Sequence, residues 1–157
     1  MLRSKLARLG LGMVAPGVRI TPAIRRTPRR SPAAARPDAY ADLFHAHHLA
    51  FGDPAVKIRG WWDLDELARQ YESFIRAHEP VLRRWQRGGP AATGREAFAD
   101  YTRVLTDWRR FPYLDPGLPA ELLPDGWIGI SAAEEFFALR ALLEEPARAY
   151  VRAVLSG

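Results

Sequence analysis

Apolar residues recur at helical spacing through the second half of the chain, and each run follows a residue pair typical of a helix start. These pairs are Asp63 with Glu66, Thr93 with Glu96, and Ser131 with Glu134. In each pair the first side chain can cap a free backbone N–H, and the acid three residues later can reciprocate. The pattern therefore predicts an all-helical segment over residues 61–156.

Each predicted helix carries an apolar stripe that should face a shared core. The first stripe is Leu64, Leu67, Ala68, Tyr71, Phe74 and Ile75, and it continues past a break or kink at Pro80 with Val81, Leu82 and Trp85. The second is Phe98, Tyr101, Leu105 and Trp108, and the third is Phe136, Phe137, Leu139 and Leu143. A separate last segment is expected to begin at Pro146. Its side chains expected to face the core are Tyr150, Val151, Val154 and Leu155.

An apolar, proline-rich connector separates the second and third predicted helices over residues 111–127. It holds four prolines, namely Pro112, Pro116, Pro119 and Pro124. Because proline fixes φ and lacks a backbone donor, this spacing predicts rigid turns and no helix. Loops are usually polar, so a connector this apolar is expected to pack against a core.

The first part of the chain shows less regular patterning. Residues 2–9 suit a short amphipathic helix, and Val18 and Ile20 alternate around Arg19 as in a short strand. For residues 43–51, periodicity alone does not decide between a strand and a short helix. Residues 23–37 are rich in proline and arginine and lack apolar spacing, so we expect them to be disordered.

Composition and charge narrow the possible functions. The net charge is +5, but residues 1–38 alone carry +8 and the remainder −3. Residues 1–38 are therefore called the basic arm. Four of its arginines suit non-specific, salt-sensitive contacts with nucleic-acid phosphates, namely Arg25, Arg26, Arg29 and Arg30. An arginine-rich, acid-poor start is also typical of an organellar transit peptide. There is no cysteine, which excludes disulfides and thiolate metal sites, and no apolar run is long enough for a membrane span.

Two stretches carry a family resemblance. The run WRRFPYLDPGLPAELLPDGW from Trp108 to Trp127, with WDLDELARQYESF from Trp62 to Phe74, resembles the C-terminal domain of the PaaX-like family. Its members are bacterial repressors of phenylacetic-acid catabolism genes. Residues 6–22 are similar to part of the family's middle, ferredoxin-like domain, which argues against a transit peptide. The positions that carry the motif are Trp62, Asp63, Tyr71, Asp115, Pro116, Leu118, Pro119, Leu122, Leu123, Pro124 and Trp127.

The resemblance implies a mainly α fold with a helical C-terminal domain over residues 60–157. Residues 1–22 and 38–59 would be a truncated α+β remnant of the ferredoxin-like domain, with residues 43–51 as a strand. The disordered segment 23–37 would interrupt it. The family's N-terminal winged helix, which reads DNA, has no counterpart in this sequence.

By resemblance, the chain is expected to be a cytoplasmic regulator reduced to effector sensing and dimerisation, with specific DNA binding doubtful. The family's effector is an acyl-coenzyme A such as phenylacetyl-coenzyme A. Trp108, Arg109 and Arg110 would suit its aryl group and phosphates. The alternative role for these arginines is an ion pair with Asp115 that pins the connector. Partners would be a second copy or a full-length homologue.

Other functions find less support in the sequence. A non-DNA-binding interaction module, or a gene product with a mis-assigned start, are the alternatives. No serine lies in a nucleophile pattern and no phosphate-binding glycine loop is present, so we expect no enzyme activity. His45, His47 and His48 lack a further ligand at zinc spacing, and no metal or cofactor is expected. The ferredoxin-like domain is similar to a CRISPR-associated nuclease, but the strand that ends in that nuclease's acid is missing.

Overall fold

The computed structural model describes residues 11–16, 18–20, 52–88 and 93–156. They divide into two compact units. One contains the residues up to Trp62 together with Asp115–Leu123, and the other contains Asp63–Leu114 with the chain from Pro124 onward. The second unit is helical, which confirms the predicted mainly α fold.

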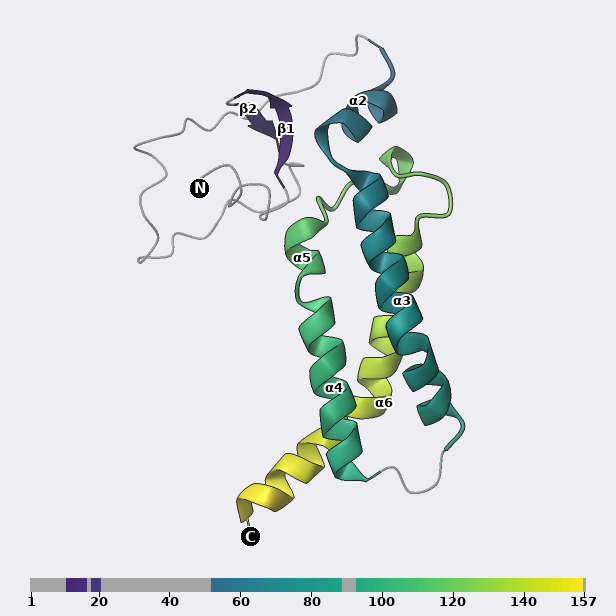
Figure 1. Ribbon diagram of the computed structural model, residues 1–157, viewed down its shortest axis with the longest axis vertical. Helices are drawn as coiled ribbons and strands as arrows, with labels where there is room; N and C mark the ends of the chain where they lie inside the picture. The colour runs from purple at the N-terminus through teal and green to yellow at the C-terminus, as the bar shows by residue number, and fades with distance from the viewer. Residues whose placement is uncertain (1–10, 17, 21–51, 89–92, 157) are drawn as a thin grey trace, which may run out of the picture. The chain divides into compact units, whose positions relative to one another are not determined.

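Three long helices form the helical unit: α3 (Leu64–Gln86), α4 (Gly94–Trp108) and α6 (Ile128–Ser156). Figure 1 shows them side by side, and α6 contacts both α3 and α4. The side chains at the centre of this unit are almost fully buried, and the largest of them are Phe74, Val104, Phe111, Leu139 and Leu143. The helices are therefore held together by one apolar core, which no one of them could form alone.

Two of the three predicted helix starts are confirmed. The Asp63 Oδ1 atom accepts a 2.8 Å hydrogen bond from the Glu66 backbone N–H and caps α3. At α4, the Thr93 Oγ1 atom accepts from the Glu96 N–H at 3.3 Å, and the Glu96 carboxylate accepts from the Thr93 N–H at 2.9 Å. A cap of this kind stabilises a helix by about 1 kcal/mol.

The third predicted start and the predicted break at Pro146 are wrong. The helix α6 begins at Ile128, so Ser131 lies inside it, and it continues through Pro146 to Ser156. Proline within a helix costs one backbone hydrogen bond. Here Leu143 and Ala147, on either side of Pro146, are buried in the core and keep the segment helical. Figure 1 shows the last turns of α6 changing direction, as expected after a proline.

The buried face of α4 also differs from the predicted stripe. The structure buries Ala97, Asp100 and Val104, whereas Phe98 and Leu105 are 42% and 38% exposed. The cause is the close approach of α4 to α6: a Cβ atom on Gly94 would lie 2.9 Å from the Tyr150 Cβ atom. At such short interhelical distances only small side chains fit between the backbones.

The prediction of which α6 side chains are buried is wrong at three positions. Phe136, Leu139 and Leu143 are buried as expected, but Phe137 is 58% exposed. Val154 and Leu155, expected to turn inward, are 60% and 82% exposed. These positions lie off the stripe that meets α3 and α4, and an apolar residue on a helix surface is common in globular proteins.

The connector contains short helical turns that the prolines were expected to exclude. The turn α5 (Phe111–Leu114) includes Pro112, and the 3₁₀ turn η2 covers Ala120–Leu122. Pro112 is tolerated because it lies in the first turn, where a backbone N–H has no helical partner. Phe111, Pro116 and Trp127 are buried, so the expected packing of the connector is confirmed at these positions.

In its described part, the first unit contains a small antiparallel sheet and one α-helix, besides the 3₁₀ turn η2. β1 (Gly12–Ala15) pairs with β2 (Val18–Ile20), which confirms the predicted strand around Arg19. Neither β1 nor α2 (Pro54–Trp61) was predicted, although Pro54 at a first helical position is a common start signal. Gly12 lies against the Trp62 ring, where an added Cβ atom would be 2.6 Å from the Trp62 Cε2 atom.

Candidate functional site

The densest group of aromatic side chains lies in the helical unit, where α3, α4 and α5 meet. The Tyr71 and Phe111 rings stack with centroids 4.2 Å apart, and Phe74 meets Phe111 edge-on at 5.8 Å. The Trp127 ring meets Tyr71 edge-on at 6.1 Å. Stacked and edge-on pairs of this kind are favourable beyond the area they bury. The motif residues Tyr71 and Trp127 are therefore part of the core.

Trp108, Arg109 and Arg110 come from the end of α4, next to this aromatic group. The Trp108 ring stacks on Phe136 with centroids 4.4 Å apart, so one of its faces is occupied. Trp108 is only half-buried, whereas both arginines are exposed. The Arg110 guanidinium carbon lies 5.0 Å from the centroid of the Phe111 ring, a cation–π contact. The three residues thus lie together, with cationic groups beside an aromatic surface.

The two arginines differ in their contacts. Arg110 contacts Phe111, while no ion pair or hydrogen bond engages the Arg109 guanidinium within the described part of the chain. The Asp115 Oδ1 atom accepts a 2.6 Å hydrogen bond from the Gly117 N–H, and Gly117 has a positive φ of 65°. This contact shapes the turn after Asp115. The expected ion pair of Asp115 with an arginine stays a prediction.

The remaining motif residues are divided between the two units. Asp63 caps α3 and Trp62 packs edge-on against Trp61 with ring centroids 6.2 Å apart. Pro119 precedes η2, and the other apolar motif positions of the connector are half-buried: Leu118, Leu122, Leu123 and Pro124. Asp63 and Trp62 therefore have a capping and a packing contact, and the structural role of the connector positions stays a prediction.

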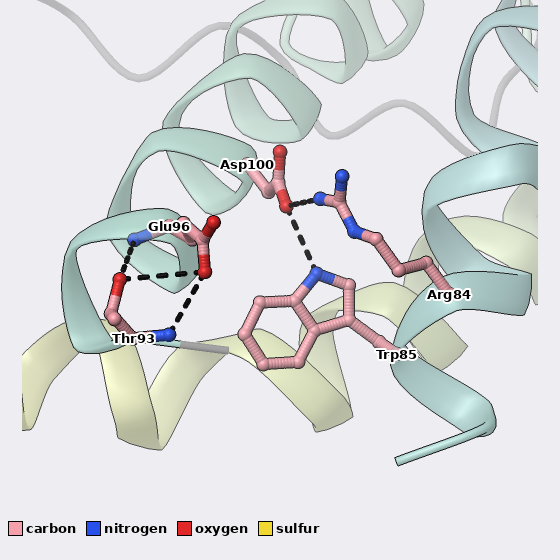
Figure 2. A network of polar contacts seen from close by, with 5 residues as sticks. All are labelled: Arg84, Trp85, Thr93, Glu96 and Asp100. Carbon is pink, nitrogen blue, oxygen red and sulfur yellow. Dashed lines mark hydrogen bonds and ion pairs between the residues drawn. The ribbon is translucent and has the colours of Figure 1, made fainter. Parts of the chain in front are cut away.

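A polar network that the sequence analysis missed joins the end of α3 to α4. Figure 2 shows the Asp100 carboxylate receiving both the Arg84 guanidinium and the Trp85 indole N–H, the latter at 2.9 Å. Asp100 is only 8% exposed. A buried carboxylate is costly unless it is paired, and these two donors satisfy it. The one signal in the sequence was the acid itself, at a position beside the apolar stripe predicted for α4.

A second missed contact also joins α3 to α4. The buried His78 has its Nε2 atom 2.9 Å from the Asp107 Oδ2 atom, and its ring packs 4.6 Å from that of Phe74. A lone histidine on an apolar helix face is typical of a satisfied core residue, and this one fits that description. The two networks thus link α3 to α4, and neither contains a residue in a nucleophile pattern.

Several predicted residues lie outside the described residues. They are the basic arm with Arg25, Arg26, Arg29 and Arg30, and the histidines His45, His47 and His48. In the described ranges, no three metal-ligating side chains gather in one place. Across the same ranges, none of the helices is both long and apolar enough to span a bilayer.

Comparison with known proteins gives two findings. The family described as PaaX-like protein C-terminal domain matches this chain over residues 62–153. The transcriptional repressor PaaX of Escherichia coli (strain K12) is 30% identical over 79 residues. That match covers half of this chain and a quarter of the relative's length. The family match thus falls on the part of the chain that contains the helical unit.

Proposed function

This chain belongs to the PaaX-like family, and we propose that it acts in transcription regulation as a cytoplasmic repressor of aromatic-acid catabolism genes. In this proposal the helical unit senses an acyl-coenzyme A effector, such as phenylacetyl-coenzyme A, and supports dimerisation. DNA is the expected target of the assembled regulator. An effector changes repression only if it binds the two functional states of the repressor with different affinities.

The observation that carries the effector proposal is the arrangement at the end of α4. Arg109 is exposed without an ion partner in the described residues, and Arg110 lies beside it on the Phe111 ring. Guanidinium groups bind phosphates through two parallel hydrogen bonds. An arginine pair next to Trp108 therefore offers contacts for both the phosphates and the aryl group of an aryl-acetyl thioester.

We expect Arg109→Ala to weaken binding of phenylacetyl-coenzyme A by roughly ten- to a hundredfold, the effect of losing a charge-assisted hydrogen bond. Its melting temperature should remain that of the unmodified chain, because the side chain is exposed. Isothermal titration of the full chain gives the affinity, and titration with free coenzyme A separates the phosphate contribution from that of the aryl group.

Arg103→Ala is the matched control, since Arg103 is another exposed arginine of α4. Arg110→Ala distinguishes the two roles considered for that residue. Lower stability with unchanged affinity would assign Arg110 a structural role, as in the alternative of an ion pair with Asp115. Equal affinity of the Arg103→Ala and Arg109→Ala proteins would contradict a phosphate site at the end of α4.

The alternative of an interaction module is favoured by one observation, an exposed apolar face on α6. Ile130 and Phe137 are seven residues apart on the same side of the helix, and they are 56% and 58% exposed. Large apolar side chains that share a surface often mark a contact with another protein. A second copy or a full-length homologue could cover them.

We expect Phe137→Ser to shift the chain toward the monomer, with a dissociation constant about tenfold or more higher, because a large aromatic side chain is lost from the interface. Light scattering after size exclusion over a concentration series measures this. Val154→Ser is the control, since Val154 is similarly exposed at 60% but lies on another side of α6. If both variants behave like the unmodified chain, this face does not mediate association.

A further inference from the structure

Glu135 is a half-buried acid on α6. Its Oε1 atom is fully buried and has no hydrogen-bond partner among the described residues. On either side of Glu135 along the helix, Ala132, Phe136 and Leu139 are part of the core. A buried carboxylate oxygen is costly when it is ionised and unpaired. Neutralisation by a proton relieves most of this cost.

Glu79 of α3 is a second acid, and its charge influences the ionisation of Glu135. Burial is the larger cause of the raised pKa of Glu135, and the negative charge of Glu79 raises this pKa further. Together the two causes raise the pKa of Glu135 from 4.5 to about 7. Glu79 is itself bound by Arg83, on its own helix. The negative charge of Glu79 on α3 thus acts on Glu135 of α6. Among the described residues, the cation bound to this pair of acids is Arg83, and it contacts Glu79.

The other charged groups around this place are already engaged or point to solvent. On α3, His78 contacts Asp107 and Arg84 contacts Asp100, while Glu72 and Arg76 are exposed. On α4, Asp107 binds His78 and Asp100 binds Arg84. Tyr101, also on α4, interacts with Arg140. On α6 itself, Glu134 is exposed and Arg140 contacts Glu144. Within the described chain, no cation compensates Glu135.

We propose that Glu135, whose buried Oε1 atom has no hydrogen-bond partner among the described residues, is a proton-sensitive position of the helical unit. The packing of α6 against α3 tightens when Glu135 is protonated and loosens when Glu135 is ionised. Protonation removes the like-charge repulsion and lets the Glu135 hydroxyl serve as a donor. The inference rests on this helix interface alone and does not depend on the proposed function. It gives the helical unit a response to pH near neutrality.

The direction of the pH effect follows from proton binding in the two states. The folded chain keeps the Glu135 proton up to about pH 7, whereas the unfolded chain releases it near 4.5. The folded state therefore binds more protons between these values, and its stability falls as pH rises through this window. The stabilisation from the proton is complete below 4.5 and lost above about 7.

We expect Glu135→Gln to raise the melting temperature of the full chain by roughly 4–8 °C at pH 8.5 and to leave it nearly unchanged at pH 4.5. The amide is neutral at every pH, so the variant lacks the decline between these values. Glu79→Gln should lower the pH at which Glu135 titrates, which carboxyl carbon NMR measures directly in both proteins. Amide hydrogen exchange in residues 128–145 should be slower at pH 5.5 than at pH 8.5, after correction for intrinsic rates.

Glu134→Gln is the matched control, because Glu134 is the exposed neighbour on the same helix. Its pH profile should run parallel to that of the unmodified chain. Parallel profiles for Glu135→Gln as well, or titration of Glu135 near 4.5 in the unmodified chain, would overturn the proposal. The NMR titration uses the unmodified chain and Glu79→Gln, so it remains decisive even if Glu135→Gln does not fold.

Discussion

Replacing Phe111 by alanine is expected to lower the free energy of unfolding of the helical unit by about 3–5 kcal/mol, the usual cost of removing a buried phenyl ring. Phe111 is only 1% exposed. Its ring stacks on Tyr71 at 4.2 Å, meets Phe74 edge-on at 5.8 Å, and lies 5.3 Å from the ring of Trp108. The loss leaves a cavity between three rigid aromatic rings, which cannot close around it without leaving their own contacts.

Chemical denaturation, followed by tryptophan fluorescence, measures this change. Tyr113→Ala is the matched control, because Tyr113 lies two residues further along α5 and is 58% exposed. Its substitution should change the free energy of unfolding by about 0.5 kcal/mol or less. Similar losses for the two variants would show that α5 is held by its backbone and not by the Phe111 side chain.

Asp100→Ala is expected to cost about 1–3 kcal/mol of stability, because two hydrogen bonds to a charged, nearly buried carboxylate are lost. In the folded chain the Asp100 carboxylate accepts from the Trp85 indole at 2.9 Å and from Arg84. After substitution the indole N–H, between α3 and α4, has lost this acceptor. Asp100→Asn should cost less, since the amide oxygen can still accept one of the two hydrogen bonds.

Arg84→Ala distinguishes the indole bond from the ion pair. The Arg84 side chain is 57% exposed, so its pair with Asp100 is screened by water and should contribute only about 0–1 kcal/mol. Denaturation midpoints of the three variants, measured together, give the order. A loss for Arg84→Ala as large as that for Asp100→Ala would mean that the ion pair, and not the Trp85 bond, stabilises this network.

The starts of α3 and α4 could be predicted because capping is a local interaction. Asp63 and Thr93 each find their partner three residues later, so the sequence contains both halves of the contact. The same spacing at Ser131 predicted a start that does not form. There the helix begins at Ile128, ahead of the serine, and the pair lies inside it. A local pattern shows that a cap can form, but it does not show where the helix begins.

The candidate site was predicted only in part, because the sequence shows local proximity but not contacts between helices. Trp108, Arg109 and Arg110 are consecutive, so their proximity follows from the sequence. That Trp108 stacks on Phe136 and Arg110 on Phe111 depends on how the helices pack. Asp100 and His78 were missed because each is matched by a residue on another helix: Trp85 and Asp107 lie 15 and 29 residues away.

The sequence by itself determined the helical class, two of the helix starts, and the family to which the chain belongs. Those depend on residue type, on contacts within one turn, and on a long motif. Only the tertiary structure decided which face of α4 is buried, where Gly94 and Ala97 allow the backbone of α6 to come close. It also decided that the Oε1 atom of Glu135 is buried without a hydrogen-bond partner among the described residues. Burial and charge at these positions are set by neighbours distant in the sequence, and periodicity along one helix does not specify those neighbours.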